Sequence, residues 1–352
     1  MARGVYAVIR REPFSLWFNP NTVFIVGRKS VTVVDANITA AHTREVLAAL
    51  RRITKKPVRY VVNTHWHEDH IIGNRVYREA FPGVEFIAHR SALADLPTVG
   101  ARNRQSSLEN GPSFVKRLRS SLENGRNLAD QNLTPEEREG YASDARLIES
   151  YLAEAPDFEI ITPDVAVDER FEIDDGERKI EILHLGKAHT AADLVVYLPR
   201  EKIVASGDLI VYPVPLVGST AYPLEYAATL ENLLKLDARA IVPGHGPVMR
   251  DAAYARLVIR LLRSLKEQTE TAYRRGETLE EMRRKIDLEE FRRAFAGRSQ
   301  HRALIFENYV FLPATAAAYR QLKEKNGSSN AGGENAAGGR RRPIARERHE
   351  KN

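Results

Sequence analysis

Residues 64–70 read THWHEDH and bring four side chains that could bind metal, His65, His67, Asp69 and His70, into one short segment. Neutral imidazole nitrogen and carboxylate oxygen are the usual non-thiol ligands of divalent transition ions. A lone histidine in a loop is more often solvated or hydrogen-bonded than bound to metal. Four such groups at this spacing reverse that expectation, so we interpret the segment as a metal site.

The elements around this segment indicate how it is positioned. It follows VRYVVNT, a β-branched run that predicts a buried strand, and it precedes GNRVYREA, which has a helical pattern. Residues at i and i+2 of an extended segment point the same way, so His65 and His67 can hold one ion. Asp69 and His70, where the chain turns, can face a second ion. The spacing therefore favours a two-metal site at the end of a strand.

Three later segments, each after a strand-like run, add candidate ligands. His189 lies in a glycine-containing loop, Asp208 ends the run KIVASGDLI, and His245 lies in the Pro- and Gly-rich turn of AIVPGHGPV. Loops at strand ends are where a sheet presents functional side chains. The full set of predicted metal ligands is His65, His67, Asp69, His70, His189, Asp208 and His245.

The order of these motifs resembles the metallo-β-lactamase superfamily. HxHxDH, GxxHT, GD and GHG are matched by residues 65–70, 186–190, 207–208 and 244–246, and the resemblance covers roughly residues 4–250. It implies an α/β fold, an αββα sandwich with a dinuclear site at one edge. It also implies that His65, His67 and His189 hold the first metal, that Asp69, His70 and His245 hold the second, and that Asp208 bridges them.

The absence of cysteine bears on the branch of this superfamily. Members with a cysteine at the bridging position hold the second ion differently, and this chain has no cysteine. With Asp208 at that position it looks more like the glyoxalase II and lactonase branches. Membership of the lactamase branch that relies on an HxHxDH loop remains an alternative.

The expected cofactors are two divalent metal ions, zinc first, with iron or manganese as alternatives for the same ligands. A hydroxide shared between two ions about 3.5 to 4 Å apart is a strong nucleophile, and the ions polarise the carbonyl under attack. We therefore expect a hydrolase of a small carbonyl substrate such as a β-lactam, lactone, ester or thioester. We also assign Asp69 a catalytic role as the general acid or base that transfers the proton of the attacking water to the leaving group. A nucleic-acid phosphodiesterase of the same superfamily is the alternative.

Two further features concern the surroundings of the metals. FSLWFNPN places an aromatic cluster on a hairpin or loop, and Trp17 and Phe18 are the predicted substrate contacts, with packing on the sheet as the alternative. Asp35 ends the third predicted strand, where it either supports a metal ligand from behind or is a plain turn residue.

The chain divides into three predicted regions. VYAVIR, TVFIVG and VTVVDA open a sandwich domain of residues 4–250 that carries a helical insert at about 91–157, with a capping box from Thr134 to Glu137. A helical extension, 251–325, follows, and its apolar stripe either closes over the sandwich or forms a homodimer contact. Residues 326–352 are rich in Gly, Ser, Asn and Arg and predict a disordered basic tail.

Charge and hydropathy limit the classes of binding partner and the cellular locations to be expected. The formal net charge is +6, and half of it comes from the predicted tail, which has six Lys or Arg against three Glu. The rest is only mildly basic, so we expect a small-molecule substrate and no nucleic-acid partner. The sequence has no run of about 18 apolar residues, so no membrane span is expected. MARGVYAVIR lacks the pattern of a signal peptide, which makes the cytoplasm the default. A periplasmic or secreted location remains open if a leader was removed.

Overall fold

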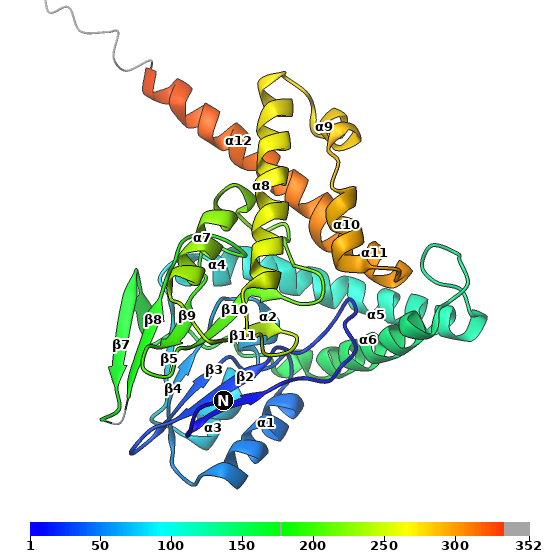
Figure 1. Ribbon diagram of the computed structural model, residues 1–352. Helices are drawn as coiled ribbons and strands as arrows, with labels where there is room; N and C mark the ends of the chain where they lie inside the picture. Colours follow the sequence, from blue (N-terminus) through cyan, green and yellow to red (C-terminus); the bar gives the residue numbers. More distant parts are fainter. Residues whose placement is uncertain (177, 334–352) are drawn as a thin grey trace, which may run out of the picture.

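Two β-sheets lie face to face between layers of helices in the computed structural model, which describes residues 1–176 and 178–333 (Figure 1). The first sheet has the strand order β1-β2-β3-β4-β5-β6. Its strands are β1 (Val5–Val8), β2 (Thr22–Val26), β3 (Val31–Val34), β4 (Val58–Val62), β5 (Glu85–His89) and β6 (Val165–Val167). The pairs from β1 to β3 are antiparallel and those from β3 to β6 are parallel. The three opening strands expected from the sequence are confirmed.

The second sheet has the strand order β11-β10-β9-β8-β7. Its strands are β7 (Arg170–Asp174), β8 (Lys179–Leu183), β9 (Val195–Leu198), β10 (Ile203–Val211) and β11 (Ala240–His245). Only the edge pair of β10 and β11 is parallel among these strands, because α7 (Pro223–Lys235) connects them. Parallel neighbours require such a crossover.

The alternation of side chains along each strand creates the layers. In β2, Val23 and Ile25 pack against the second sheet, whereas Phe24 between them packs under the helices on the outer face. Successive strand residues point to opposite faces, so one strand serves two cores. The first sheet is covered by α1 (Ala40–Ile53) and α3 (Asn74–Ala80). The second is covered by α7 and α8 (Ala253–Arg274). The αββα sandwich is therefore confirmed.

The helical insert lies between β5 and β6. It consists of α4 (Ala92–Asp95), the π-helical segment η1 (Leu96–Gly100), α5 (Ala101–Asn124), α6 (Pro135–Glu154) and the short η2 (Ala155–Asp157). The capping box predicted at the start of α6 is present, with Thr134 and Glu137 each accepting a backbone N–H of the other. Leu118 of α5 packs against Tyr141 and Ile148 of α6, and this contact holds the two long helices together.

The C-terminal extension begins with α8 and continues through α9 (Leu279–Lys285), α10 (Glu289–Ala296), α11 (Gln300–Phe306), the π-helical segment η3 (Glu307–Phe311) and α12 (Leu312–Gly333). The predicted capping box at Thr278 and Glu281 is present. The apolar stripe of α8, including Val258 and Leu262, is buried in one core with the second sheet and α7. Of the two alternatives, the stripe closes over the sandwich.

The tail departs from its predicted boundary. Disorder was expected from residue 326, but α12 continues to Gly333, and residues 334–352 lie outside the described part of the chain. Extending a formed helix costs far less than nucleating one, so a polar sequence can continue a helix whose earlier turns are packed. Among the described helices, none combines the length and the hydropathy needed to cross a membrane.

Candidate metal centre

The candidate ligands meet at one edge of the sandwich, where β4, β10 and β11 come together. His65 follows β4, His245 is the last residue of β11, and His189 lies in the loop between β8 and β9. The helix α2 (Glu68–Ile71) begins directly after His67 and turns the chain at Asp69. All seven predicted ligands are thus brought to one place by elements far apart in the sequence.

Asp208 lies inside β10 and not at its end, which differs from the sequence prediction. The register between β10 and β11 shifts on both sides of Gly207, as in a β-bulge. Gly207 has φ +51, and a Cβ there would lie 2.4 Å from Thr64 Oγ1, so only glycine fits. Bulges re-aim side chains next to active sites, and this one directs Asp208 toward the histidines.

The first group of potential ligand atoms comprises His65, His67 and His189, whose ligand atoms all lie within 4.8 Å of one another. Nε2 of His189 lies 2.9 Å from Nδ1 of His67. These two nitrogens already point at a common space. The group matches the three residues expected to hold the first metal.

The second group comprises Asp69, His70 and His245. Nε2 of His70 and Nε2 of His245 each lie 3.2 Å from Asp69 Oδ2. The group matches the residues expected to hold the second metal.

Asp208 lies between the two groups. Its Oδ1 is 3.4 Å from Nε2 of both His70 and His245, and its Oδ2 is 3.6 Å from Nε2 of His189 and 4.0 Å from Nε2 of His65. One carboxylate oxygen therefore faces each group, which is the arrangement that a bridging ligand requires. Gly244 leaves the necessary room, because a Cβ there would lie 1.9 Å from Asp208 Oδ1.

All five candidate histidine rings use their outward nitrogen in a contact that fixes the ring orientation. The outward contacts are His65 Nδ1 with Thr64 Oγ1 at 3.2 Å, His189 Nδ1 with Leu216 O at 3.0 Å, His245 Nδ1 with Asn19 O at 3.0 Å, His67 Nε2 with Thr220 Oγ1 at 3.1 Å, and His70 Nδ1 with Asp35 Oδ2 at 2.9 Å. Partners of this kind select the tautomer of a metal-binding histidine and orient its ring. The inward nitrogen of each ring is left to face the site.

The buried polar atoms of the site test whether metal ions fit. In the described residues, Nε2 of His65, His70 and His245 and Oδ1 of Asp208 are buried and have no partner with hydrogen-bond geometry, although oppositely charged groups lie 3.2 to 4.0 Å from them. Buried polar atoms are almost always satisfied in native proteins. Four orphaned atoms of the ligand types that divalent transition ions prefer therefore fit metal coordination. The residues present thus fit divalent metal ions.

The electrostatics of the site favour the metal-binding protonation state at some ligands and oppose it at others. Burial, together with the neighbouring His189, lowers the pKa of His67 to about 3, so His67 is held as the neutral imidazole that metals bind. Burial alone would raise the pKa of Asp69, but His70 and His245 hold that pKa well below its usual value. The Asp69 carboxylate is therefore ionised, as a ligand must be.

Burial alone would lower the pKa of His70 and of His245, but the carboxylates of Asp69 and Asp208 raise the pKa of His70 well above its usual value and that of His245 to about 9. Metal binding at these two imidazoles therefore has to displace a proton.

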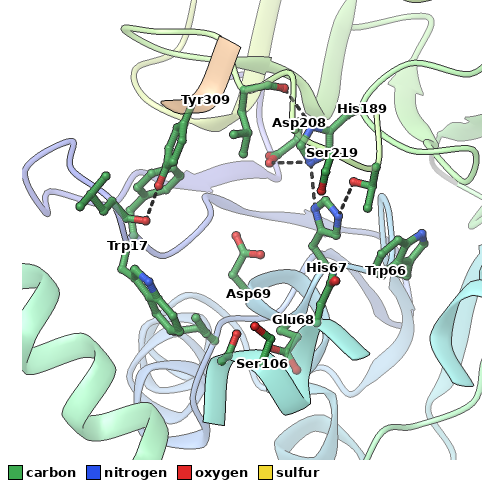
Figure 2. Close-up of a pocket in the computed structure, with 18 residues that line it drawn as sticks. Trp17, Trp66, His67, Glu68, Asp69, Ser106, His189, Asp208, Ser219 and Tyr309 are labelled. Carbon is green, nitrogen blue, oxygen red and sulfur yellow. Dashed lines mark hydrogen bonds and ion pairs between the residues drawn. The ribbon is translucent and has the colours of Figure 1, made fainter. Parts of the chain in front are cut away.

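A cavity of about 490 Å³ opens above the two groups (Figure 2). Figure 2 shows Trp17 and Tyr309 on one side and His67 and His189 on the other, with Asp69 between them. The residues that line the cavity are Leu16, Trp17, Phe18, Ile38, Trp66, His67, Glu68, Asp69, Asn103, Ser106, Ser107, His189, Asp208, Leu216, Gly218, Ser219, Thr220 and Tyr309.

The predicted substrate contacts both reach this cavity, and both also pack against protein. The Phe18 ring lies edge-on to the His245 ring at 4.3 Å, and the Trp17 ring lies edge-on to Tyr151 of α6 at 5.3 Å. The packing of Trp17 is on the helical insert and not on the sheet, which was the alternative considered from the sequence. Their role toward a substrate remains a prediction.

Several lining residues were not found from the sequence. Trp66 lies inside the HxHxDH motif and could have been considered there, since it is the residue between two ligands. Leu216 and Thr220 belong to a loop without a recognisable motif, and Tyr309 belongs to the C-terminal extension. No local pattern distinguishes these three from other residues of their types.

Comparisons with known proteins support the same fold. Residues 16–245 match the model of the metallo-beta-lactamase superfamily. A linear primary-alkylsulfatase from Pseudomonas sp. is 25% identical over 275 residues, 74% of this chain and 48% of the relative. A hydroxyacylglutathione hydrolase from Gloeobacter violaceus is 39% identical over 80 residues, 22% of this chain and 30% of the relative. The chain thus spans about half the length of the alkylsulfatase.

Two solved structures have a similar backbone. A double mutant of the sec-alkyl sulfatase PisA1 covers 92% of this chain with a TM-score of 0.61 and 15% identity, over 49% of its own length. The metallo-beta-lactamase FIM-1 from Pseudomonas aeruginosa covers 75% of this chain with a TM-score of 0.51 and 17% identity, over 92% of its own length. Together with the match over residues 16–245, these likenesses show that the chain belongs to the metallo-β-lactamase superfamily.

Proposed function

We propose that the protein is a dinuclear metal-dependent hydrolase that cleaves at the carbonyl of a small, largely apolar substrate such as a β-lactam, lactone, ester or thioester. The observation that carries this proposal is the position of both ligand groups under one cavity with aromatic walls. Among the described residues that line this cavity there is no Lys or Arg, and the walls offer mainly apolar surface to the acyl group of a substrate.

The cofactors of this proposal are two divalent ions, with zinc as the first expectation. The first ion would be held by His65, His67 and His189, and the second by Asp69, His70 and His245. Asp208 would contribute to both ions. When bound, such ions supply a hydroxide nucleophile at neutral pH and polarise the carbonyl.

Asp69 is the proposed proton carrier of the reaction. Its side chain is 21% exposed, whereas the Asp208 side chain is 2% exposed, and Asp69 also lines the cavity. A general acid or base must be within reach of the proton that it transfers. Both ligand carboxylates line the cavity, but Asp69 is the more exposed of the two, so it is the better placed to take a proton from the nucleophile and give it to the leaving group.

The walls of the cavity divide the substrate contacts. Trp17 and Phe18, together with Leu216 of the loop 214–220, offer apolar surface. Asn103 and Ser106 of α5 offer polar groups on the insert side. Apolar pockets with a few placed polar groups are typical of small-molecule sites. We therefore assign the acyl group to the aromatic side and the polar part of the substrate to α5.

Hydrolysis of an alkyl sulfate is the second candidate, because the relative that matches 74% of this chain is an alkylsulfatase. The apolar cavity would suit an alkyl chain. A sulfate head, however, would have to be neutralised by the metal ions alone, because none of the described lining residues is a Lys or Arg that could pair with it. A nucleic-acid phosphodiesterase meets the same difficulty with more negative charge. The carbonyl substrate is favoured on this ground.

One substrate panel tests the proposal. Metal-loaded protein is assayed with a chromogenic cephalosporin, an acyl-homoserine lactone, an aryl ester, a glutathione thioester, an alkyl sulfate and a bis-aryl phosphate diester. We expect kcat/KM for at least one carbonyl compound to exceed that for the sulfate and the diester by about a hundredfold or more. His245→Ala, which removes one proposed ligand, controls for contaminating hydrolases. Faster release of sulfate than of any acyl product would overturn the assignment.

A further inference from the structure

Tyr309 lines the metal cavity although it lies in the C-terminal extension, beyond the residues 16–245 that match the superfamily model. It sits on the π-helical segment η3, between α11 and α12. π-Helical turns are rare and occur frequently at functional sites. The π-helical segment η3 therefore places Tyr309 beside the candidate metal centre.

The side chain of Tyr309 contacts the flap, which we define as residues 14–18. Its hydroxyl donates a hydrogen bond to the backbone oxygen of Leu16 (Figure 2). Its ring centroid lies 6.4 Å from that of Phe18, whose ring in turn lies 4.3 Å from His245. The extension therefore holds the flap at the position where the flap meets a candidate ligand.

The insert holds the flap from another direction. The Asp144 carboxylate on α6 accepts hydrogen bonds from Ser15 Oγ at 2.6 Å, Trp17 N at 3.0 Å and Leu16 N at 3.2 Å. Asp144 is fully buried, so these bonds are shielded from water. With Asp144 on the N–H side and Tyr309 on the carbonyl side, both polar groups of Leu16 are paired with other elements.

The backbone of Tyr309 contacts the opposite wall. Its carbonyl oxygen accepts a hydrogen bond from Val217 N at 2.8 Å. Val217 belongs to the loop 214–220, in which Leu216 O is paired with His189 and Thr220 Oγ1 with His67. One residue of the extension thus contacts both the flap and the loop that orients two candidate ligands.

We infer that Tyr309 is a positioning residue, through which the C-terminal extension sets the spacing between the flap and the loop 214–220 across the metal cavity. The expected effect of Tyr309 on substrate binding rests on the proposed function, but its effect on the position of the flap does not. A substrate with a large acyl group needs the flap in place, because it reaches Trp17 and Phe18. A substrate with a very small acyl group does not.

The positional part is tested by hydrogen exchange of the full-length chain, which requires no substrate. Tyr309→Phe keeps the ring and removes the hydroxyl, and Tyr319→Phe makes the same change elsewhere in the extension, where Tyr319 packs against Tyr273. We expect the amides of Leu16 and Trp17 to exchange about tenfold faster or more in Tyr309→Phe and to be unchanged in Tyr319→Phe. Unchanged flap exchange in Tyr309→Phe, or an equal increase in both variants, would overturn the inference.

The kinetic part compares aryl acetate with aryl octanoate on metal-loaded protein. Tyr309→Phe should raise KM for the octanoate about fivefold while kcat for both esters stays within about twofold. In a Trp17→Ala background, Tyr309→Phe should raise KM for the octanoate little further, because Tyr309 and Trp17 are proposed to act through the same flap. Additive effects in the double variant would show that Tyr309 does not act through the flap. If another carbonyl compound of the panel is the better substrate, a short-acyl and a long-acyl form of that compound replace the two esters. Absence of turnover of every carbonyl compound in the parent protein would reject the proposed function and leave the exchange result standing.

Discussion

Oδ2 of Asp35 lies 2.9 Å from Nδ1 of His70, and both side chains are buried. The same carboxylate accepts hydrogen bonds from the backbone N–H and the hydroxyl of Thr64, next to His65. Because Nδ1 of His70 is engaged behind the site, Nε2 is the nitrogen that faces Asp69 and Asp208. Of the two sequence interpretations of Asp35, support of a ligand from behind is the one that these contacts favour.

The first prediction concerns this support. Asp35→Asn should lower metal affinity about tenfold to a hundredfold, because an amide has only one acceptor oxygen for three donors. Asp35 has φ 61, a conformation that asparagine tolerates, so the backbone should persist. Competition with a chromogenic chelator measures the affinity, and circular dichroism checks the fold. Parent-like affinity in a folded variant would mean that His70 needs no orienting partner.

The second prediction concerns the stoichiometry of the metals. Reconstituted protein should contain two ions per chain, and His245→Ala should retain one, because His245 belongs only to the second group. Asp208→Ala should weaken both ions, since its two oxygens face the two groups. Elemental analysis after gel filtration measures the content. Parent protein with a single ion after reconstitution would reject the dinuclear proposal.

The third prediction concerns proton transfer. Asp69→Asn should reduce kcat by about a hundredfold or more, since general acid–base catalysis contributes that much and an amide cannot accept the proton. Loss of an ionised ligand also weakens the second site, so turnover must be measured at saturating metal. Asp168→Asn, the same change in an exposed ion pair with Arg90, should leave kcat unchanged. Near-parent turnover by fully loaded Asp69→Asn would refute the proton role.

Much of the site was predictable from the sequence because its signals are local. His65, His67, Asp69 and His70 are close in the chain, and His189, Asp208 and His245 stand in short motifs after apolar runs. The sandwich itself follows from alternation within strands such as β2. Such patterns are readable without knowledge of long-range contacts.

The contacts that orient the ligands from outside the site could not be predicted from the sequence, and the reason is physical. Leu216 and Asn19 orient His189 and His245 through backbone carbonyls, which every residue has, so the residue type carries no signal. Tyr309 reaches Leu16 over a separation of 293 residues, and only the packing of the extension brings them together. The bulge at Asp208 likewise depends on the contact between Gly207 and Thr64. These features belong to tertiary structure.

The fourth prediction concerns the end of the chain. Truncation after Lys325 should leave kcat/KM within about twofold of the full chain. The cavity is lined by residues no later than Tyr309, and the packed residues Ala314, Ala317 and Ala318 of α12 all precede the cut. Truncation after Phe306 serves as the contrasting variant, because it removes Tyr309 as well. A tenfold loss on truncation after Lys325 would show that residues beyond it act on the site.

The fifth prediction concerns pH and uses Asp144, the anchor of the flap. Burial raises the pKa of Asp144 from its usual value to about 6, even though Ser15 and the backbone of Trp17 and Leu16 donate hydrogen bonds to it. The folded state therefore keeps this proton at a pH where the unfolded state, with a pKa of about 3.9, has lost it. The stability that protonation provides is fully present below about pH 4 and is lost as the pH rises through about 6.

Asp144→Asn isolates this contribution, because asparagine is neutral at every pH. The free energy of unfolding of the parent minus that of the variant should fall by up to about 3 kcal/mol between about pH 4.5 and 7.5, from a shift of roughly two pKa units. Urea denaturation of both proteins in the presence of a chelator measures the difference and removes the effect of metal release, which both proteins share. A difference between the two proteins that does not change with pH would mean that Asp144 is ionised in both states, and the flap would then be anchored by a carboxylate over the whole range.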